Sequence, residues 1–130
     1  RDAVEFDYFT TIQGIMQKDD ETDPSFEVPL KLKELYKAKD YGKYASKDGN
    51  LRVCYLSNND ITGGNSGSPV INGNGELVGL AFDGNWEAMS GDIAYETELQ
   101  RTIICDIRYV LFIIDKYAGA QNLIKELKIK

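Results

Sequence analysis

The chain has 130 residues, of which 42% are hydrophobic and 28% are charged, and its formal net charge is −6. This length and hydrophobic content predict one domain with a single core. The negative balance, without any Lys- or Arg-rich cluster, excludes a nucleic-acid partner, because phosphate contacts require concentrated positive charge. The longest apolar run, residues 109–114, is far shorter than the roughly 20 residues that cross a bilayer, so no membrane span is expected.

The first 50 residues predict a strand, an acidic loop and a short helix. The chain begins at Arg1 without an initiator Met or a visible signal peptide, which indicates a piece of a longer protein. Residues 5–17 are rich in aromatic and β-branched side chains, which predicts a strand with a bulge near Gly14. Residues 18–29 are acidic and contain two prolines, which predicts a loop, and residues 30–39 predict an amphipathic helix.

From residue 51 to residue 96 the pattern changes to short strands separated by turns. Eight of the 12 glycines lie between Gly63 and Gly91. Strands are predicted at residues 53–56, 69–71, 76–82 and 92–95. The sequence Asn-Gly-Asn-Gly at residues 72–75 predicts a hairpin, because both Asn-Gly pairs tolerate the positive φ angles of hairpin turns.

Residues 97–130 are predicted to form a C-terminal helical segment. Thr97 and Gln100 have the spacing of a capping box. A stripe with the i, i+3, i+4, i+7 spacing of a buried helix face follows, formed by Val110, Ile113, Ile114 and Tyr117. Gly119 is expected to interrupt the helix before a last amphipathic segment at residues 122–128.

The two cysteines, Cys54 and Cys105, do not have the spacing of a metal site. They could pair in an oxidising compartment, but two separately buried apolar thiols are the favoured interpretation. No metal or other cofactor is expected.

Residues 63–70 have the features of a nucleophile loop. Glycines on both sides of Ser66 let the chain turn sharply, so that a hydroxyl projects while nearby N–H groups converge on one point. A Gly-x-Ser-Gly pattern alone favours an ordinary surface loop. The longer sequence, with a hairpin and then Gly79–Phe82, resembles the region around the nucleophile of chymotrypsin-like peptidases. Asn65 stands where trypsin-like zymogens have Asp, so activation by a newly cut N-terminus is not expected.

Three further segments carry a closer resemblance: residues 57–70, 72–93 and 108–127. Through them, the chain from about Tyr8 onward resembles the C-terminal part of the bacterial serine dipeptidyl aminopeptidases, the dipeptidyl-peptidase 7 and 11 family. The resemblance implies a mainly β fold with C-terminal helices, the C-terminal barrel half of a chymotrypsin-like double β-barrel. Residues 1–130 would then be the C-terminal portion of the catalytic domain.

The resemblance also accounts for the lack of histidine in the chain. In the family the triad His and Asp lie far upstream of the serine, so the base is expected in the upstream remainder of the same polypeptide. Ser66 is the implied catalytic nucleophile, and the N–H groups of Gly64 and Ser66 are the implied oxyanion hole. The 130-residue chain alone is therefore expected to be inactive.

Asp83 and Gly84 carry the expected substrate specificity. Alone, Asp83 would be an exposed aspartate at a strand end, but in the family an aspartate at this place helps to hold the α-amino group of the substrate. An extended dipeptide spans about 7 Å at 3.3–3.6 Å per residue, so such a carboxylate would measure two residues from the cut. Members that prefer acidic residues carry Arg at the place of Gly84, whereas glycine leaves room and resembles the dipeptidyl-peptidase 7 type, which accepts apolar and aromatic residues. The alternative for Gly84 is a turn glycine.

Two neighbouring residues are given no catalytic role. Asp60 lies six residues before Ser66, but its stretch also fits acid-selective relatives and does not indicate basic specificity. Trp86 is expected to be a packing or rim residue.

The leading hypothesis is part of a serine dipeptidyl aminopeptidase that releases dipeptides from oligopeptides with a free N-terminus. It implies a bacterial periplasmic or cell-surface enzyme that, like its relatives, forms a homodimer. A chymotrypsin-like endopeptidase and a non-catalytic peptide-binding module are the alternatives.

Overall fold

The computed structural model describes residues 7–86, 88 and 100–130. Their contacts divide the chain into two compact units. The sheet unit consists of Arg1–Thr10 and Val53–Ile107, and the helical unit consists of Thr11–Arg52 and Arg108–Lys130. No helix among the described residues has both the length and the apolar character that a bilayer span requires.

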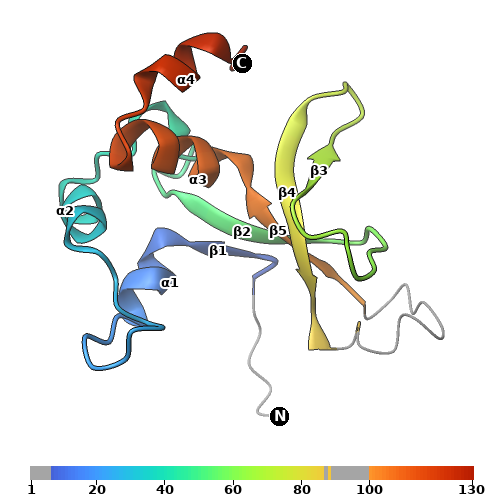
Figure 1. Ribbon diagram of the computed structural model, residues 1–130, viewed down its shortest axis with the longest axis horizontal. Helices are drawn as coiled ribbons and strands as arrows, with labels where there is room; N and C mark the ends of the chain where they lie inside the picture. The colour runs from blue at the N-terminus through green and yellow to red at the C-terminus, as the bar shows by residue number, and fades with distance from the viewer. Residues whose placement is uncertain (1–6, 87, 89–99) are drawn as a thin grey trace. The chain divides into compact units, whose positions relative to one another are not determined.

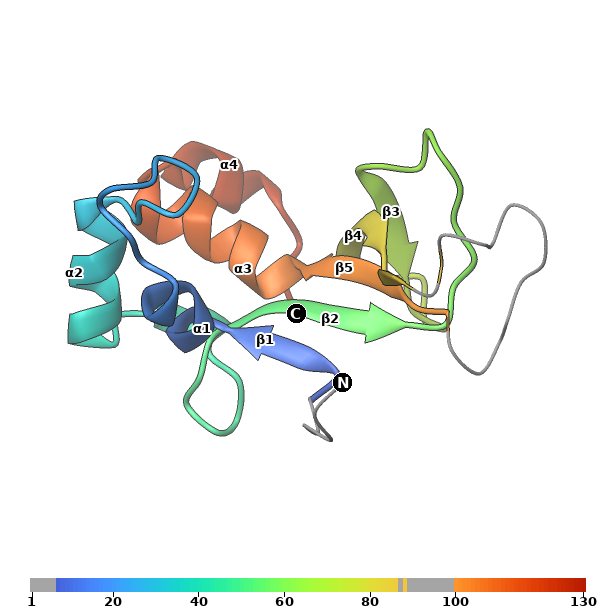
Figure 2. The ribbon, with the colours of Figure 1, turned by 90° about the horizontal axis from the view of Figure 1, so that it is seen from below.

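A five-stranded sheet forms the first unit, with the order β1-β2-β5-β4-β3 (Figures 1 and 2). Its strands are β1 (Phe9–Thr11), β2 (Arg52–Ser57), β3 (Ser68–Ile71), β4 (Leu77–Gly84) and β5 (Thr102–Asp106). The β2–β5, β5–β4 and β4–β3 pairs are antiparallel. The strands predicted within residues 51–82 are confirmed, whereas the one predicted at residues 92–95 lies outside the described residues.

The predicted hairpin joins β3 to β4. The Asn72 N–H donates to the Glu76 carbonyl at 3.0 Å, and the Asn72 side-chain oxygen accepts from the N–H groups of Asn74 and Glu76 at 2.9 and 3.0 Å. Gly75 has a φ of +76°. One positive-φ glycine and one Asn side chain that closes the turn therefore make the connection, rather than two equivalent Asn-Gly pairs.

The close approach of β4 to β5 depends on Gly79. A Cβ atom at this position would lie 2.4 Å from the Ile104 Cγ2 and 2.8 Å from the carbonyl oxygen of Cys105. Glycine in a strand interior often marks such a close backbone approach.

The helical unit contains α1 (Ile12–Gln17), α2 (Leu30–Ala38), the 3₁₀ turn η1 (Gly42–Tyr44), α3 (Ile107–Phe112), the π-helical η3 (Ile113–Tyr117) and α4 (Gln121–Glu126). Its buried hydrophobic residues are Ile12, Val28, Leu32, Tyr41, Tyr44, Leu51, Phe112 and Ile124. Phe112 is fully buried and packs edge-on against Tyr41, with ring centroids 6.2 Å apart. The predicted helix at residues 30–39 and the interruption at Gly119, whose φ is +68°, are confirmed.

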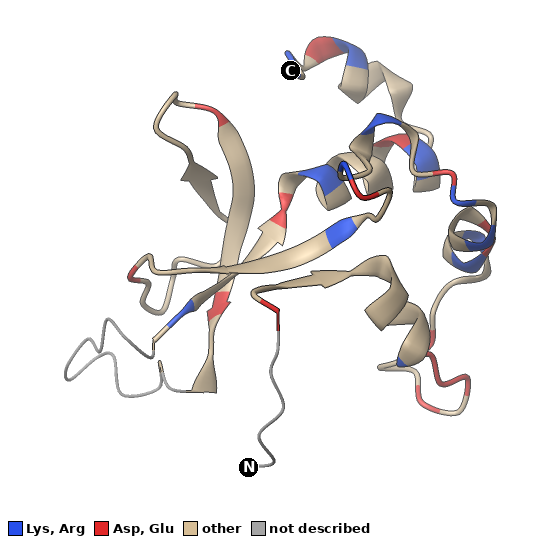
Figure 3. Cartoon of the chain, turned by 180° about the vertical axis from the view of Figure 1, so that it is seen from behind, with Lys and Arg blue, Asp and Glu red and all other residues tan. Residues whose placement is uncertain are grey.

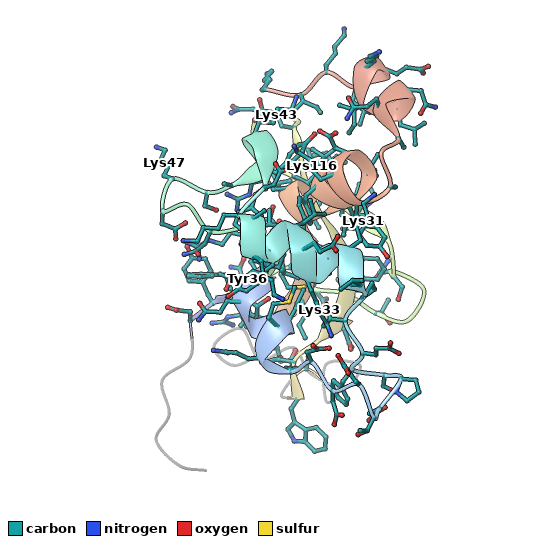
Figure 4. The ribbon with its side chains drawn as sticks, turned by 90° about the vertical axis from the view of Figure 1, so that its left-hand side faces the viewer. Lys31, Lys33, Tyr36, Lys43, Lys47 and Lys116 are labelled. Atoms are coloured by element: carbon teal, nitrogen blue, oxygen red, sulfur yellow. The ribbon has the colours of Figure 1, made fainter. Side chains whose placement is uncertain are left out.

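Ion pairs join the segments of the helical unit. Lys33 on α2 and Lys116 on η3 are labelled in Figure 4. The amine of Lys33 lies 2.6 Å from the Asp19 carboxylate, and the amine of Lys116 lies 2.7 Å from the Asp40 carboxylate. Lys and Arg residues lie mainly in the helical unit, and the strands carry few charges (Figure 3).

The strand predicted at residues 5–17 is wrong for most of its length. Among residues 7–17, only β1 is a strand, and Ile12–Gln17 form α1, so Gly14 lies in a helix rather than at a bulge. Ile12, Ile15 and Met16 have the i, i+3, i+4 spacing of a helix face. The Ile12 N–H, moreover, donates to the Leu51 carbonyl at 3.0 Å, which gives this first orphan donor of the helix a partner.

The prediction of helix throughout residues 97–130 is also wrong, because Thr102–Asp106 form β5. Buried and half-buried residues alternate along this strand, which is the period of two expected for β structure. Thr97 lies outside the described residues, and Gln100 is not helical. The predicted stripe is only half-buried, and Phe112 is buried instead. From Ile113 onward the helix widens to a π turn, in which the Ala118 N–H donates to the Ile113 carbonyl.

The prediction that Cys54 and Cys105 are thiols rather than a disulfide is confirmed, because both are free, but the prediction that they are separately buried is wrong. Cys54 and Cys105 are directly opposite each other on β2 and β5, and both are half-buried.

Candidate active site

The serine loop, residues 58–67, connects β2 to β3 through two tight turns. The Asn65 N–H donates to the Thr62 carbonyl at 3.1 Å, and the Ser68 N–H donates to the Asn65 carbonyl at 2.9 Å. The side-chain oxygen of Asn65 accepts from the Thr62 N–H at 2.8 Å. The neutral side-chain amide of Asn65 therefore stabilises the loop by a hydrogen bond to the loop's own backbone.

Glycines provide the backbone angles that these turns require. Gly64 and Gly67, which lie on either side of Ser66, have φ angles of +97° and +85°. Residues with a side chain rarely adopt such positive φ angles, so the loop requires glycine at both positions.

Ser66 lies at the exposed tip of the loop and contacts β4. Its hydroxyl donates to the Phe82 carbonyl at 3.3 Å, and the Gly67 N–H donates to the Ala81 carbonyl at 2.7 Å. Within the described residues, neither the Gly64 N–H nor the Ser66 N–H donates to a backbone carbonyl. Two amide donors and one hydroxyl are thus placed on a loop that is fixed to a strand.

A bulge in β4 lies opposite this contact. Ala81 pairs with Ile104 while Asp83 pairs with Ile103, so Phe82 is the extra residue between them. Both Phe82 and Asp83 are exposed, and one oxygen of the Asp83 carboxylate accepts from the Gly84 N–H at 2.8 Å. The Ser66 hydroxyl therefore contacts the residue directly before Asp83.

Gly84, which pairs with Thr102, is more crowded than its sequence position suggested. A Cβ atom here would lie 2.8 Å from the Cβ of Ala88. Glycine was expected to leave space at this position for a substrate side chain. That expectation is wrong for the space that a Cβ of residue 84 would occupy, because Ala88 fills this space.

The residues that brace this region were not predicted from the sequence. The Thr102 hydroxyl, which is 2% exposed, donates to the Asn59 carbonyl at 2.6 Å, at the start of the serine loop. The Asn85 N–H donates to the Arg101 carbonyl at 2.9 Å, and the Arg101 N–H donates to the Asn85 side chain at 2.8 Å. Asn85, as an amide directly after a strand, gave a weak signal, whereas Thr102 gave none.

A small hollow adjoins these braces, lined by Asn59, Asp60, Ile61, Ala88, Gln100, Arg101 and Thr102. Asp60 therefore lies at a concave surface, together with an arginine. Trp86 is 74% exposed, which fits a rim residue and not a packing residue.

Comparison with known proteins relates the chain to peptidases. The family model described as Peptidase S46 matches residues 1–129. The dipeptidyl-peptidase 7 of Phocaeicola vulgatus is 62% identical over 129 residues, which are 99% of this chain and 18% of that protein. The Asp/Glu-specific dipeptidyl-peptidase of Porphyromonas endodontalis is 52% identical over 128 residues, 98% of this chain and 18% of that protein.

Solved structures give the same relation. The crystal structure of Porphyromonas endodontalis DPP11 in complex with substrate superposes with a TM-score of 0.94 at 52% identity, over 97% of this chain and 18% of that one. The same protein in complex with the dipeptide Arg-Asp gives a TM-score of 0.97 at 51% identity, over 100% of this chain and 19% of that one. The chain thus spans less than a fifth of the length of these relatives.

Proposed function

The chain belongs to the peptidase S46 family, and from this premise we propose that it is the nucleophile-bearing part of a serine dipeptidyl-peptidase. The observation that carries the proposal is the hydrogen bond from the Ser66 hydroxyl to the Phe82 carbonyl, directly before Asp83. It supports a site in which the hydroxyl of the nucleophile, Ser66, contacts the residue next to the one that carries the carboxylate, Asp83.

In the proposed reaction, the Ser66 oxygen attacks the carbonyl carbon of the scissile peptide bond. A base from the rest of the longer polypeptide takes the hydroxyl proton, since this chain has no histidine. The N–H groups of Gly64 and Ser66 stabilise the oxyanion, and one such donor is worth roughly 3–4 kcal/mol. The base then protonates the leaving amine, and water releases the dipeptide from the acyl-enzyme.

Asp83 would set the length of the product. The ammonium of an extended dipeptide lies about 7 Å from the scissile carbonyl. A carboxylate one residue beyond the Ser66 contact can bind this ammonium, whereas a longer N-terminal extension would leave the carboxylate without its cation. The names of the relatives, dipeptidyl-peptidase 7 and Asp/Glu-specific dipeptidyl-peptidase, support two residues as the unit released.

For the residue before the cut, we propose apolar and aromatic side chains. Gly84 provides no cation to bind an acidic side chain, and Ala88 adds a methyl group beside it. Relatives of both specificities resemble this chain, so substrate profiling decides. Preferential cleavage after Asp or Glu would refute the proposed preference and would turn attention to Arg101 at the hollow.

The proposed setting is the periplasm or surface of a bacterial cell. In that setting the sheet unit is the C-terminal half of a double β-barrel whose other half comes from the upstream polypeptide, and the enzyme forms a homodimer. Negligible hydrolysis is expected from the 130-residue chain alone, and turnover by this chain would contradict the external base.

The test uses the full-length protein with a fluorophosphonate probe and dipeptidyl substrates. Ser66→Ala should abolish both labelling and turnover while the fold is retained. An intact, unlabelled wild-type protein would instead favour the non-catalytic peptide-binding module.

The Asp83 assignment has its own test. Asp83→Asn should leave probe labelling intact and lower kcat/KM for free-amine substrates by about 10- to 150-fold, the worth of a hydrogen bond to a charged group. Equal cleavage of N-terminally acetylated and free peptides by the wild type would favour an endopeptidase.

A further inference from the structure

The two cysteines of the chain meet at the centre of the sheet. Cys54 on β2 and Cys105 on β5 are directly opposite in the antiparallel register, and β2 and β5 are neighbours in the strand order. Residues that oppose each other across an antiparallel pair project from the same face of the sheet. The two thiols therefore face the same side, although 50 residues separate them in the chain.

This register satisfies the geometric requirement of a disulfide. Directly opposed residues on antiparallel strands have Cα atoms about 4.5–5.5 Å apart. Disulfides span Cα separations of about 4.4–6.8 Å. The bond can therefore form without a change of register, and both side chains are half-buried rather than enclosed.

The two thiols are coupled to each other. A hydrogen bond between their side chains, assisted by one from the side chain of Thr10, lowers the pKa of Cys54. Burial and the negative charge of Asp106 oppose this effect. The same bond, together with burial, raises the pKa of Cys105. The opposed register places the two thiols side by side, and the lowered pKa supports Cys54 as the attacking thiol, with Cys105 as the thiol that resolves the mixed disulfide.

We propose that Cys54 and Cys105 form a thiol–disulfide exchange site that is oxidised by small disulfides. The Cys54 thiolate attacks one sulfur of the oxidant, which forms a mixed disulfide and releases one thiol. Cys105 then loses its proton and attacks the Cys54 sulfur, which forms the intramolecular disulfide and releases the second thiol. Two electrons and two protons pass from the cysteines to the oxidant, which is reduced to two thiols.

The bond would link β2 to β5 and close a loop that contains the serine loop, the hairpin and Asp83. This consequence follows from the positions of the two cysteines in the chain and does not depend on the proposed peptidase activity. A failure of that activity would therefore leave the exchange site untouched, and the reverse also holds.

Peptide mapping of the full-length protein tests the proposal. Trypsin releases Cys54 in the peptide of residues 53–101 and Cys105 in the peptide of residues 102–108, because Arg52, Arg101 and Arg108 flank them. After incubation with oxidised glutathione at neutral pH and alkylation, non-reducing mass spectrometry should find these peptides linked. A phosphine reductant should separate them.

The single variants test the assigned roles. With Cys105→Ser, the mixed disulfide with glutathione should accumulate on Cys54. With Cys54→Ser, a mixed disulfide should accumulate on Cys105 in the same way, because each single variant lacks the thiol that would resolve it. Circular dichroism confirms that each variant is folded.

Two results would overturn the proposal. The first is that the two peptides remain unlinked in the oxidised wild-type protein, whether both cysteines are alkylated or both are protected from alkylation. The pair would then not form the intramolecular disulfide. Accumulation of the mixed disulfide on Cys54 in the wild-type protein, to the level seen in Cys105→Ser, would refute the role of Cys105 as the resolving thiol.

Discussion

Replacement of Gly79 by Ala should separate β4 from β5. The added Cβ would lie 2.4 Å from the Ile104 Cγ2, whereas ordinary carbon contacts occur at about 3.5–4.0 Å, so the strand must move by roughly 1 Å. Rotation of Ile104 cannot relieve the whole overlap, because the Cys105 carbonyl oxygen, which belongs to the backbone, would lie 2.8 Å away.

The size of the effect follows from this geometry. Overpacking in a tight site costs about 1–3 kcal/mol, which corresponds to about 5- to 150-fold in an opening equilibrium. Hydrogen exchange followed by mass spectrometry on the full-length protein should show this loss of protection at residues 77–84 and 102–106. Since β4 carries Asp83 and the carbonyl that Ser66 contacts, kcat/KM should fall as well, by up to about 100-fold.

Gly14→Ala is the matched control. Nothing lies within 4 Å of a Cβ at Gly14, which is in α1, so alanine should stabilise the helix by roughly 0.5–1 kcal/mol. Exchange at β4 should not change in this variant. If Gly79→Ala left exchange at residues 77–84 as slow as Gly14→Ala does, the reasoning about strand contact would be refuted.

Three further predictions concern single side chains. Thr102→Val, which removes the hydroxyl bonded to the Asn59 carbonyl, should destabilise the serine loop by about 1 kcal/mol in hydrogen exchange, while Thr102→Ser should not; equal effects would exclude the hydrogen bond as the cause. Asn65→Ala removes the oxygen that accepts from the Thr62 N–H, so it should lower kcat/KM roughly fivefold. Asn65→Asp keeps an acceptor and should lower kcat/KM less. A larger loss for Asn65→Asp than for Asn65→Ala in steady-state kinetics would contradict this role of the hydrogen bond. Burial, and then the hydrogen bond to Asp115, raise the pKa of Tyr44 from its ordinary value of 10.0 to about 12. The free energy of unfolding that the neutral phenol contributes is therefore fully present below pH 10 and is lost as the pH rises through about 12. Urea unfolding across this range should show a smaller pH-dependent loss for Tyr44→Phe than for the wild type, and equal losses would assign the effect to other groups.

Local signals in the sequence were sufficient where a few adjacent residues determine the structure. The hairpin at residues 72–75 and the helix α2 belong to this class, since turn residues and a 3.6-residue period act within one short segment. The serine loop belongs to it as well, because its turns use the backbone and the Asn65 side chain within the loop.

Signals failed where a segment takes its structure from distant partners. The sequence of β5, Thr-Ile-Ile-Cys-Asp, is a short apolar run whose periodicity fits either a strand or a buried helix. Its two neighbours, β2 and β4, decide for the strand, and both pairings bring together residues that lie far apart in the sequence. The facing of Cys54 and Cys105 and the contact between Thr102 and Asn59 depend on this same pairing, so no local pattern could have indicated them.

The exposure of Asp83 depends on one inserted residue. In a regular strand, residues two apart share a face, so Asp83 would lie on the face of Ala81, which is only 3% exposed. A carboxylate there would be buried in an apolar surface, at a high cost in desolvation. Because Phe82 is the extra residue of the bulge, the alternation is broken and both Phe82 and Asp83 are exposed. The bulge that presents the Phe82 carbonyl to Ser66 is therefore also what makes the Asp83 carboxylate available to a substrate ammonium in the proposed reaction.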